Sequence, residues 1–297
     1  MQLFQKLFLS KPNLEASTQP VICLLYDRLP TLNLEVALQA LDSFEPMAEK
    51  PLLRIEQDLK TGSMLFATVS WEAHTIHIGG LPSPLPPAVV ERCIIPSPWN
   101  PAWKEMAQSH GANLILLYEG KAHDTVEQYL ALYKVAAALR TDGTLAVVNE
   151  PAWTCHPVEI VDQILDPHFL PMVRHSPPLV YWTGLLSVDW QEEQWLITRG
   201  NRLFRLPELA WPVDELTDPM EVLNTLHEIA LYFYFEGKDL HAGDLLNIDE
   251  QNYFTFKHLG EARASLESHG ATLVVERVHA DEAETLMEQD TDNQETY

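Results

Sequence analysis

The chain has 297 residues, 46% of them hydrophobic, which is enough to bury one large core or two ordinary ones. It carries 43 acidic and 19 basic side chains, a formal net charge of -24. Because such a surface repels nucleic-acid phosphates and anionic lipid head groups, we expect no nucleic acid and no membrane among its partners.

The two ends of the chain differ from the rest. Residues 1–19 form a predicted N-terminal extension, and residues 281–297 contain seven acids and no Lys or Arg. We interpret the second segment as an acidic, disordered tail. The extension carries an apolar stripe that would lie on one face of a short helix, either docked on the protein or serving as an anchor: Leu3, Phe4, Leu7 and Phe8.

The segment that follows alternates between strand and helix patterns. The apolar run at 20–27 predicts a strand, and a 3.6-residue stripe predicts a helix over 34–44 with Asn33 as its N-cap. Two strands are predicted next, at 52–58 and 63–71, the second continuing through the sequence HTIHI.

A proline-rich loop then interrupts the pattern. Residues 79–101 contain seven prolines, which predicts a rigid loop with one helical turn at 88–94. The rest of this part is predicted as a helix, a buried strand, a long helix ended by Gly143 and a further strand, at 101–110, 112–120, 123–143 and 144–150.

The second part is richer in hairpins. We expect residues 151–178 to be mostly irregular around one short helix, and a long helix to begin at Asp218 and end at Gly237. Antiparallel strands are predicted at 178–190, 192–200, 201–206, 252–259 and 271–279. The sequence therefore predicts an α+β fold of mixed and antiparallel sheets with packed helices, in two halves of similar size, 20–150 and 151–280.

Histidine and cysteine spacing gives no metal-site signature. His74 and His77 are three apart in a predicted strand, where odd spacing sends side chains to opposite faces. A looser group matches no zinc pattern: Cys155, His156, His168 and His175. We therefore expect no metal and no cofactor.

The three cysteines are widely separated along the chain. Cys23, Cys93 and Cys155 form neither a disulfide framework nor a zinc motif, which is typical of a cytoplasmic protein. The chain also lacks a G-x-S-x-G elbow, a phosphate-binding P-loop and a G-x-G-x-x-G motif, so we find no catalytic residues and favour a non-enzymatic protein.

The segment DLHAGDLLNID is similar to the catalytic loop of small-molecule kinases. Its Asp244 and Asn247 are three apart, whereas the kinase pattern has five, and no D-F-G motif follows. We interpret it as a polar turn built on Gly243 and Asp244. A ligand site at His241, Asp244 and Asn247 remains the alternative.

Four tryptophans fall within thirty residues, at 182, 190, 195 and 211. Core and hairpin packing explains them, and the alternative is an aromatic anchor at an interface. A predicted hairpin combines two of them with acids, and we take it as the candidate surface for a protein partner: Asp189, Trp190, Glu192, Glu193 and Trp195.

Two stretches carry a family outline. The first runs from GGLPSPLPP through HGANLILLYEG to TLAVVNEP. The second contains LPMVRHSPPLVYWTG, RGNRLFRLPELAW and LYFYFEGKDLHAGDLLNIDEQNYFTF. Over about residues 20–258 the chain resembles the bacterial domain of unknown function 4261 family. Four residues match that family's G-x-x-[IL]-x-x-G-D-T-[IL]-G turn: Gly237, Leu240, Gly243 and Asp244. Two positions differ from it, with Leu245 in place of the Thr and Asn247 in place of the last Gly.

The family's T-x-G-L segment has two possible counterparts, at 183–185 or 202–204, and its following motif is matched by Pro207, Glu208 and Leu209. Since the family has no established activity, the resemblance implies a fold and a bacterial, cytoplasmic setting without catalytic residues. We expect a protein-binding module, either an immunity protein or an adaptor of a secreted toxin system, with a basic partner. The alternative is a small-molecule enzyme or ligand-binding protein with a site near His241 and Asp244.

Overall fold

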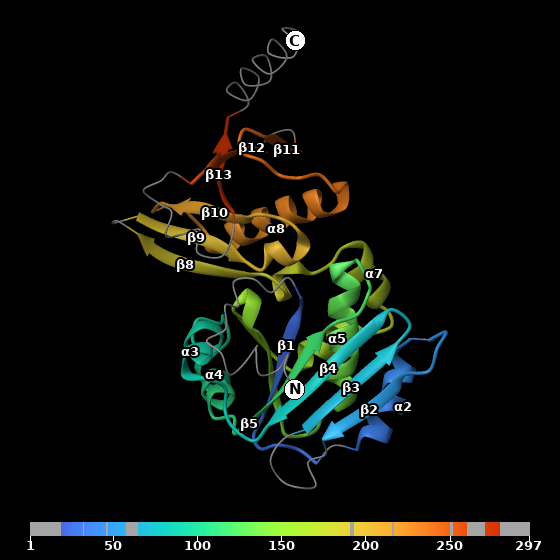
Figure 1. The fold of residues 1–297 in the computed structure, drawn as a ribbon. Helices are drawn as coiled ribbons and strands as arrows, with labels where there is room; N and C mark the ends of the chain where they lie inside the picture. The colour runs from blue at the N-terminus through green and yellow to red at the C-terminus, as the bar shows by residue number, and fades with distance from the viewer. Residues whose placement is uncertain are drawn as a thin grey trace. The chain divides into compact units, whose positions relative to one another are not determined.

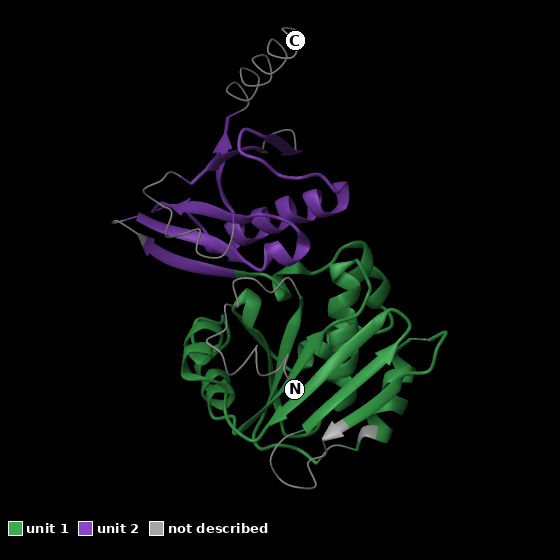
Figure 2. Cartoon of the chain, in the orientation of Figure 1, with its two compact units in different colours: residues 1–184 green, residues 185–297 purple. Residues whose placement is uncertain are grey.

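The computed structural model describes residues 19–279 apart from 32, 46, 58–64, 191–192, 216, 250–251 and 260–270. Residues 1–18 of the predicted extension and the predicted acidic tail lie outside the described residues. The chain divides into two compact units, residues 1–184 and 185–297 (Figure 2). Each unit combines helices with one antiparallel or mixed sheet, so the predicted α+β class is confirmed.

The boundary between the units differs from the predicted one near residue 150. Strand β7 (Thr154–Pro157) pairs antiparallel with β6 (Thr144–Asn149) and so extends the sheet of unit 1. Helices α6 (Glu159–Leu165) and α7 (Leu170–His175) follow within the same unit, α6 packing on the helix that precedes β6. The stretch expected to be irregular is therefore largely ordered, and the units are unequal in length.

The sheet of unit 1 has seven strands in the order β2-β3-β4-β5-β1-β6-β7, and every neighbouring pair is antiparallel. The first strand is inserted between two later ones, and its neighbour β5 is buried along its whole length. The remaining bounds are β1 (Val21–Tyr26), β2 (Leu52–Gln57), β3 (Leu65–Trp71), β4 (His74–Leu81) and β5 (Ala112–Tyr118).

One face of this sheet is covered by two long helices, α2 (Leu34–Phe44) and α5 (Thr125–Leu139) (Figure 1). Both begin where the sequence predicts, because Asn33 and Asp124 accept hydrogen bonds from the backbone N–H groups of Val36 and Val126. Helix α5 ends at Leu139, four residues before the predicted stop at Gly143. Eleven of its fifteen residues are buried, so it forms much of the core.

The other face is covered by the proline-rich segment. It contains α3 (Pro87–Val89) and the π-helical turn η3 (Val90–Ile94), and α4 (Pro101–Gln108) follows it, which confirms the predicted helical turn and the helix after it. Side chains alternate along β5. Consequently Leu116 faces the long helices, whereas Ile115 and Leu117 face the proline-rich segment.

Unit 2 is a six-stranded mixed sheet with one long helix, and its strand order is β11-β12-β13-β10-β9-β8. Strands β10 and β13 pair in parallel, whereas the pairs β9–β10, β11–β12 and β12–β13 are antiparallel. The predicted cap Asp218 and stop Gly237 of helix α8 are confirmed. The bounds are β8 (Gly184–Trp190), β9 (Glu193–Arg199), β10 (Glu208–Val213), α8 (Pro219–Glu236), β11 (Leu245–Asp249), β12 (Asn252–His258) and β13 (Thr272–Val278).

One predicted strand of unit 2 is wrong. Residues 201–206 begin with a 3-10 helix, η6 (Asn201–Phe204), because Gly200 before it and Arg205 after it have left-handed backbone angles, with φ of 110° and 62°. The strand formed instead is β10. Among the described residues of both units, no helix is long and apolar enough to cross a membrane.

Candidate functional site

A cavity of about 360 Å³ lies in unit 1 between the sheet and the proline-rich segment. Twelve of its sixteen described lining residues are aliphatic, proline or cysteine, and the polar ones are Ser83, Arg92, Asn113 and Glu150. The walls come from β1, β5, the end of β6 and the segment 81–92. The volume and the apolar lining with few polar groups are typical of small-molecule sites.

The proline-rich wall is held in place by two buried side chains. The Asn113 Nδ2 group donates a 2.7 Å hydrogen bond to the carbonyl of Ser83. Nε2 of His110 accepts a 2.8 Å bond from the backbone N–H of Leu85, so Nδ1 carries the proton that bonds the carbonyl of Ala107. Burial lowers the pKa of His110, which keeps the ring neutral and able to accept. The cavity is therefore a preformed feature of the fold.

The charged side chains among the described lining residues form an ion pair. Nη2 of Arg92 donates to Oε1 of Glu150 at 3.1 Å, and Nε of Arg92 donates to the carbonyl of Ala88. The guanidinium carbon lies 5.6 Å from the ring centre of Trp153, a cation–π contact. Burial raises the pKa of Glu150, while the neighbouring Arg92 acts in the opposite direction.

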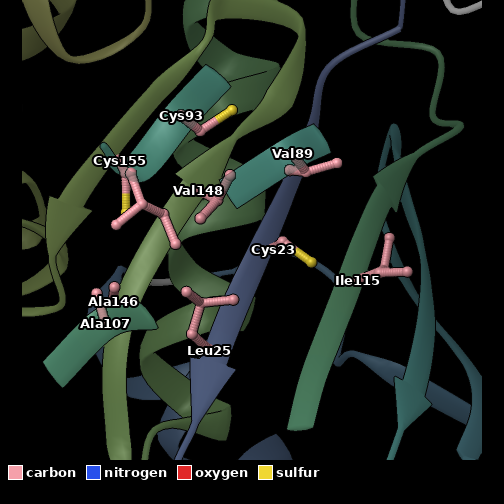
Figure 3. Close-up of a cluster of buried hydrophobic side chains, with 10 residues drawn as sticks. Cys23, Leu25, Val89, Cys93, Ala107, Ile115, Ala146, Val148 and Cys155 are labelled. Carbon is pink, nitrogen blue, oxygen red and sulfur yellow. The ribbon is translucent and has the colours of Figure 1, made fainter. Parts of the chain in front are cut away.

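The three cysteines meet in the core beside this cavity. They come from β1, η3 and β7, and all three are buried thiols of one cluster (Figure 3). Burial raises the pKa of Cys93 to about 12, and it raises those of Cys23 and Cys155 as well. Cys23 is the one that lines the cavity. As neutral thiols they are poor nucleophiles, so the cavity favours binding over cysteine chemistry.

Sequence reasoning missed the polar residues of this cavity. Arg92 and Glu150 are 58 positions apart, and their pairing depends on how the proline-rich segment folds across the sheet. The available signals were local: Arg92 interrupts the apolar sequence AVVERCII, and Glu150 directly follows a buried strand.

Unit 2 carries an open depression lined by acidic residues, which we call the acidic hollow. It is an open depression of about 580 Å³ whose described lining contains no Lys or Arg. Its apolar floor includes Trp195, Pro212, Val213 and Val274. Four carboxylates also line the hollow: Glu193, Asp214, Glu215 and Glu276. One of them, Glu276, is paired with the ammonium group of Lys257.

The predicted partner-binding hairpin contributes to this hollow in part. Asp189 and Glu193 are exposed, and Glu193 lines the hollow. Trp195 is 1% exposed and packs in a core cluster with Ile197 and Val274, so its ring supports the floor of the hollow and is not an exposed anchor. Trp190 is the last residue of β8, and Glu192 lies outside the described residues.

The alternative site near His241 forms a turn. Oδ2 of Asp244 accepts a 2.7 Å hydrogen bond from the backbone N–H of His241, and Gly243 has a φ of 97°, which confirms the predicted polar turn. Asn247 is an exposed residue of β11. None of the three lines the cavity or the acidic hollow.

The histidines singled out by spacing are dispersed. His74 contacts the hydroxyl of Tyr118, whereas His77 bonds Thr68 and Glu119. Of the looser group, His168 and His175 are exposed and Cys155 and His156 are buried on β7. In the parts of the chain that the structure describes, no three His, Cys, Asp or Glu side chains are arranged to hold a metal ion.

His156 is a buried histidine at the sheet edge. Its ring lies edge-on to those of Trp99 and Tyr181, at centroid distances of 6.0 and 5.4 Å. Burial lowers its pKa to about 4, against an opposing backbone contribution from Tyr181. The ring is therefore neutral at physiological pH.

A buried carboxylate in unit 2 explains one of the resembling motifs. Glu208 is 1% exposed and accepts hydrogen bonds from the hydroxyl of Thr198 and the backbone N–H groups of Gly200 and Asn201. Burial raises the pKa of Glu208, while these hydrogen bonds and Arg199 oppose the rise. Its contacts hold the turn between β9 and β10, which indicates a structural role.

Comparison of the chain with protein-family models, with curated proteins and with solved structures found no match. The resemblance to the domain of unknown function 4261 family thus remains a prediction.

Proposed function

We propose that this protein is a non-enzymatic binding module that engages a basic segment of a protein partner through the acidic hollow of unit 2. The observation that carries the proposal is that four carboxylates and four apolar residues line the same depression. Lys and Arg have aliphatic stems and charged heads, so their stems can pack on the floor while their heads pair with the rim. The net charge of -24 adds long-range attraction for such a segment.

A neighbouring depression enlarges the acidic surface. It has a volume of about 480 Å³, shares Asp214 and Glu276 with the hollow, and adds Asp218 and Glu221. Its one described basic lining residue, Arg277, is paired with Glu221 at 2.8 Å. Among the described residues that line the two depressions, carboxylates outnumber Lys and Arg, which supports a basic occupant.

The test uses a synthetic peptide of about ten lysines and arginines and measures its association rate by stopped-flow fluorescence. Raising the salt from about 50 to about 500 mM shortens the Debye length from roughly 14 to roughly 4 Å, so association should slow about tenfold or more. Dissociation should change less, because charges at the rim of an interface act mainly on the on-rate.

A pair of matched variants separates the hollow from the overall charge. Replacing Glu193 and Glu215, both exposed in the rim, by Gln should slow association several-fold. The control removes two exposed acids outside the hollow, Glu228→Gln with Asp239→Asn, and changes the net charge equally. Equal rates for the two double variants would contradict binding at the hollow and leave the acidity as a determinant of solubility.

The narrower role as an immunity or adaptor protein is part of the same proposal, as is a bacterial, cytoplasmic setting. Support comes from the acidic surface, the absence of a catalytic signature in the sequence and the three unpaired buried cysteines. A toxin gene next to the gene for this protein, and inhibition of that toxin by the purified protein, are the expected observations. Neighbouring genes without any toxin would contradict the role.

A second candidate function, small-molecule binding, is favoured by the cavity of unit 1. The cavity is preformed and lined by an ion pair, and His241 and Asp244 are not among its lining residues. A small-molecule ligand of this chain would therefore bind in the cavity of unit 1 and not at His241 and Asp244.

A further inference from the structure

The size of the unit 1 cavity limits what it can hold. Its volume of about 360 Å³ corresponds to about twelve water molecules, each occupying about 30 Å³ in the liquid. An occupant would accordingly have on the order of a dozen non-hydrogen atoms. The lining is mainly aliphatic, with Leu81, Val89, Ile115 and Leu117 among its side chains, so most of those atoms would be carbon.

The charge of the wall limits the occupant further. Arg92 and Glu150 neutralise one another, and no other acidic or basic side chain is among the described lining residues. A carboxylate or an amine would bring an uncompensated charge into an apolar space, which is costly. An uncharged hydroxyl can accept a hydrogen bond from the guanidinium or donate one to the carboxylate without this cost.

We propose that the cavity of unit 1 binds an uncharged small molecule with an aliphatic body and one hydrogen-bonding head, of which a medium-chain alcohol is the simplest case. The body lies against the side chains of β1 and β5, and the head meets the Arg92–Glu150 pair. Because Asn113 and His110 hold the proline-rich wall, binding requires little reorganisation of the protein.

The first experiment compares octanol, octanoate and octylamine on the full chain by titration calorimetry and thermal unfolding. Octanol should bind at least about tenfold more tightly than either charged analogue, and it should raise the melting midpoint by about 3 °C when its free concentration is about ten times the dissociation constant. Tighter binding of either charged analogue, or no binding of octanol, would overturn the proposal.

A charge-switching variant tests the Arg92–Glu150 pair directly. Glu150→Gln keeps the shape of the wall but leaves Arg92 uncompensated, so the preference should change from octanol to octanoate. The matched control is Asp162→Asn, which removes an exposed partner of Arg140 on α6 and changes the net charge by the same amount. The control should keep the wild-type order of ligands, and the same change of order in both variants would overturn the assignment.

A cavity-filling variant tests the location. Val148 is fully buried and lines the cavity, so Val148→Phe should abolish octanol binding while the protein remains folded. Octanol binding that survives in the folded variant would place the ligand elsewhere. If Val148→Phe does not fold, the comparison of Glu150→Gln with its control still decides between the outcomes.

Discussion

The two faces of the seven-stranded sheet are covered in different ways. The long helices α2 and α5 cover one face, and α5 alone contributes large fully buried residues such as Tyr129, Leu130 and Tyr133. The proline-rich segment covers the other face, where the three core cysteines lie, and leaves a cavity. Side chains of a regular helix pack closely against a sheet. The backbone of a proline-rich segment is restricted by its prolines, so parts of it can lie farther from the sheet and leave a cavity.

Adjacent leucines of β5 give the largest expected difference between the faces. Leu116→Ala removes packing against the helical face and should lower the free energy of unfolding by about 3 to 5 kcal/mol. Leu117→Ala should cost only about 2 to 3 kcal/mol, because Leu117 borders the cavity and already lacks neighbours on that side. Urea unfolding of the two variants measures both, and an equal or larger loss at Leu117 would contradict the comparison.

Much of this architecture follows from local signals in the sequence. Asn33, Asp124 and Asp218 start helices where their side chains accept backbone hydrogen bonds, and Gly237 ends one with a left-handed φ of 62°. Each of these capping signals acts within a few residues, so the helix ends can be predicted without knowledge of the fold.

The arrangement of the elements depends on distant pairings that no local pattern contains. Strand β1 lies between β5 and β6, and β10 pairs with the distant β13. The proline pattern predicts a loop with a helical turn, but it gives no indication that the loop encloses a cavity whose charged pair joins Arg92 to Glu150. Part of the acidic hollow could be predicted from the sequence, because Glu193 and Trp195 belong to a local hairpin. Asp214 and Glu276 could not be assigned to it, because the pairing of β10 with β9 and β13 brings them there.

Strand β7, at the edge of the sheet, should make the protein sensitive to acid. The buried His156 has a pKa of about 4, below its ordinary value of 6.5, so the unfolded chain binds a proton more readily than the folded one. Stability should therefore fall as the pH decreases from about 6.5 to about 4, by up to about 3 kcal/mol. In His156→Phe this loss should disappear, as measured by urea unfolding across that range.

The exposed His168 provides the control for this prediction. His168→Gln should retain the pH dependence of the wild-type protein between about 6.5 and about 4. A His156→Phe variant with an unchanged pH profile would show that acid acts through other groups.

The smallest expected effects come from two carboxyl groups whose pKa values shift in opposite directions. On the helical side, Arg174 donates two 2.8 Å hydrogen bonds to Glu45, and Lys134 donates another, so the pKa of Glu45 falls to about 2. Its stabilisation is present above about pH 4.5 and is lost as the pH falls towards 2; after allowance for solvent screening we expect about 1 kcal/mol. On the cavity side, burial raises the pKa of Glu150, so its contribution is greatest below about pH 4.5 and declines as the pH rises.

Gln substitutions at these two positions should consequently give opposite pH profiles. Glu45→Gln should be less stable than the wild-type protein at pH 7, with the difference vanishing in acid. Glu150→Gln mimics the protonated carboxyl, so it should be more stable than the wild-type protein at pH 7, with the difference again shrinking towards pH 4. Urea unfolding at several pH values measures both differences. If both variants are less stable than the wild-type protein at pH 7, the cavity wall stabilises the charged form of Glu150 just as the helical side stabilises that of Glu45. The two faces of the sheet would then differ in packing alone.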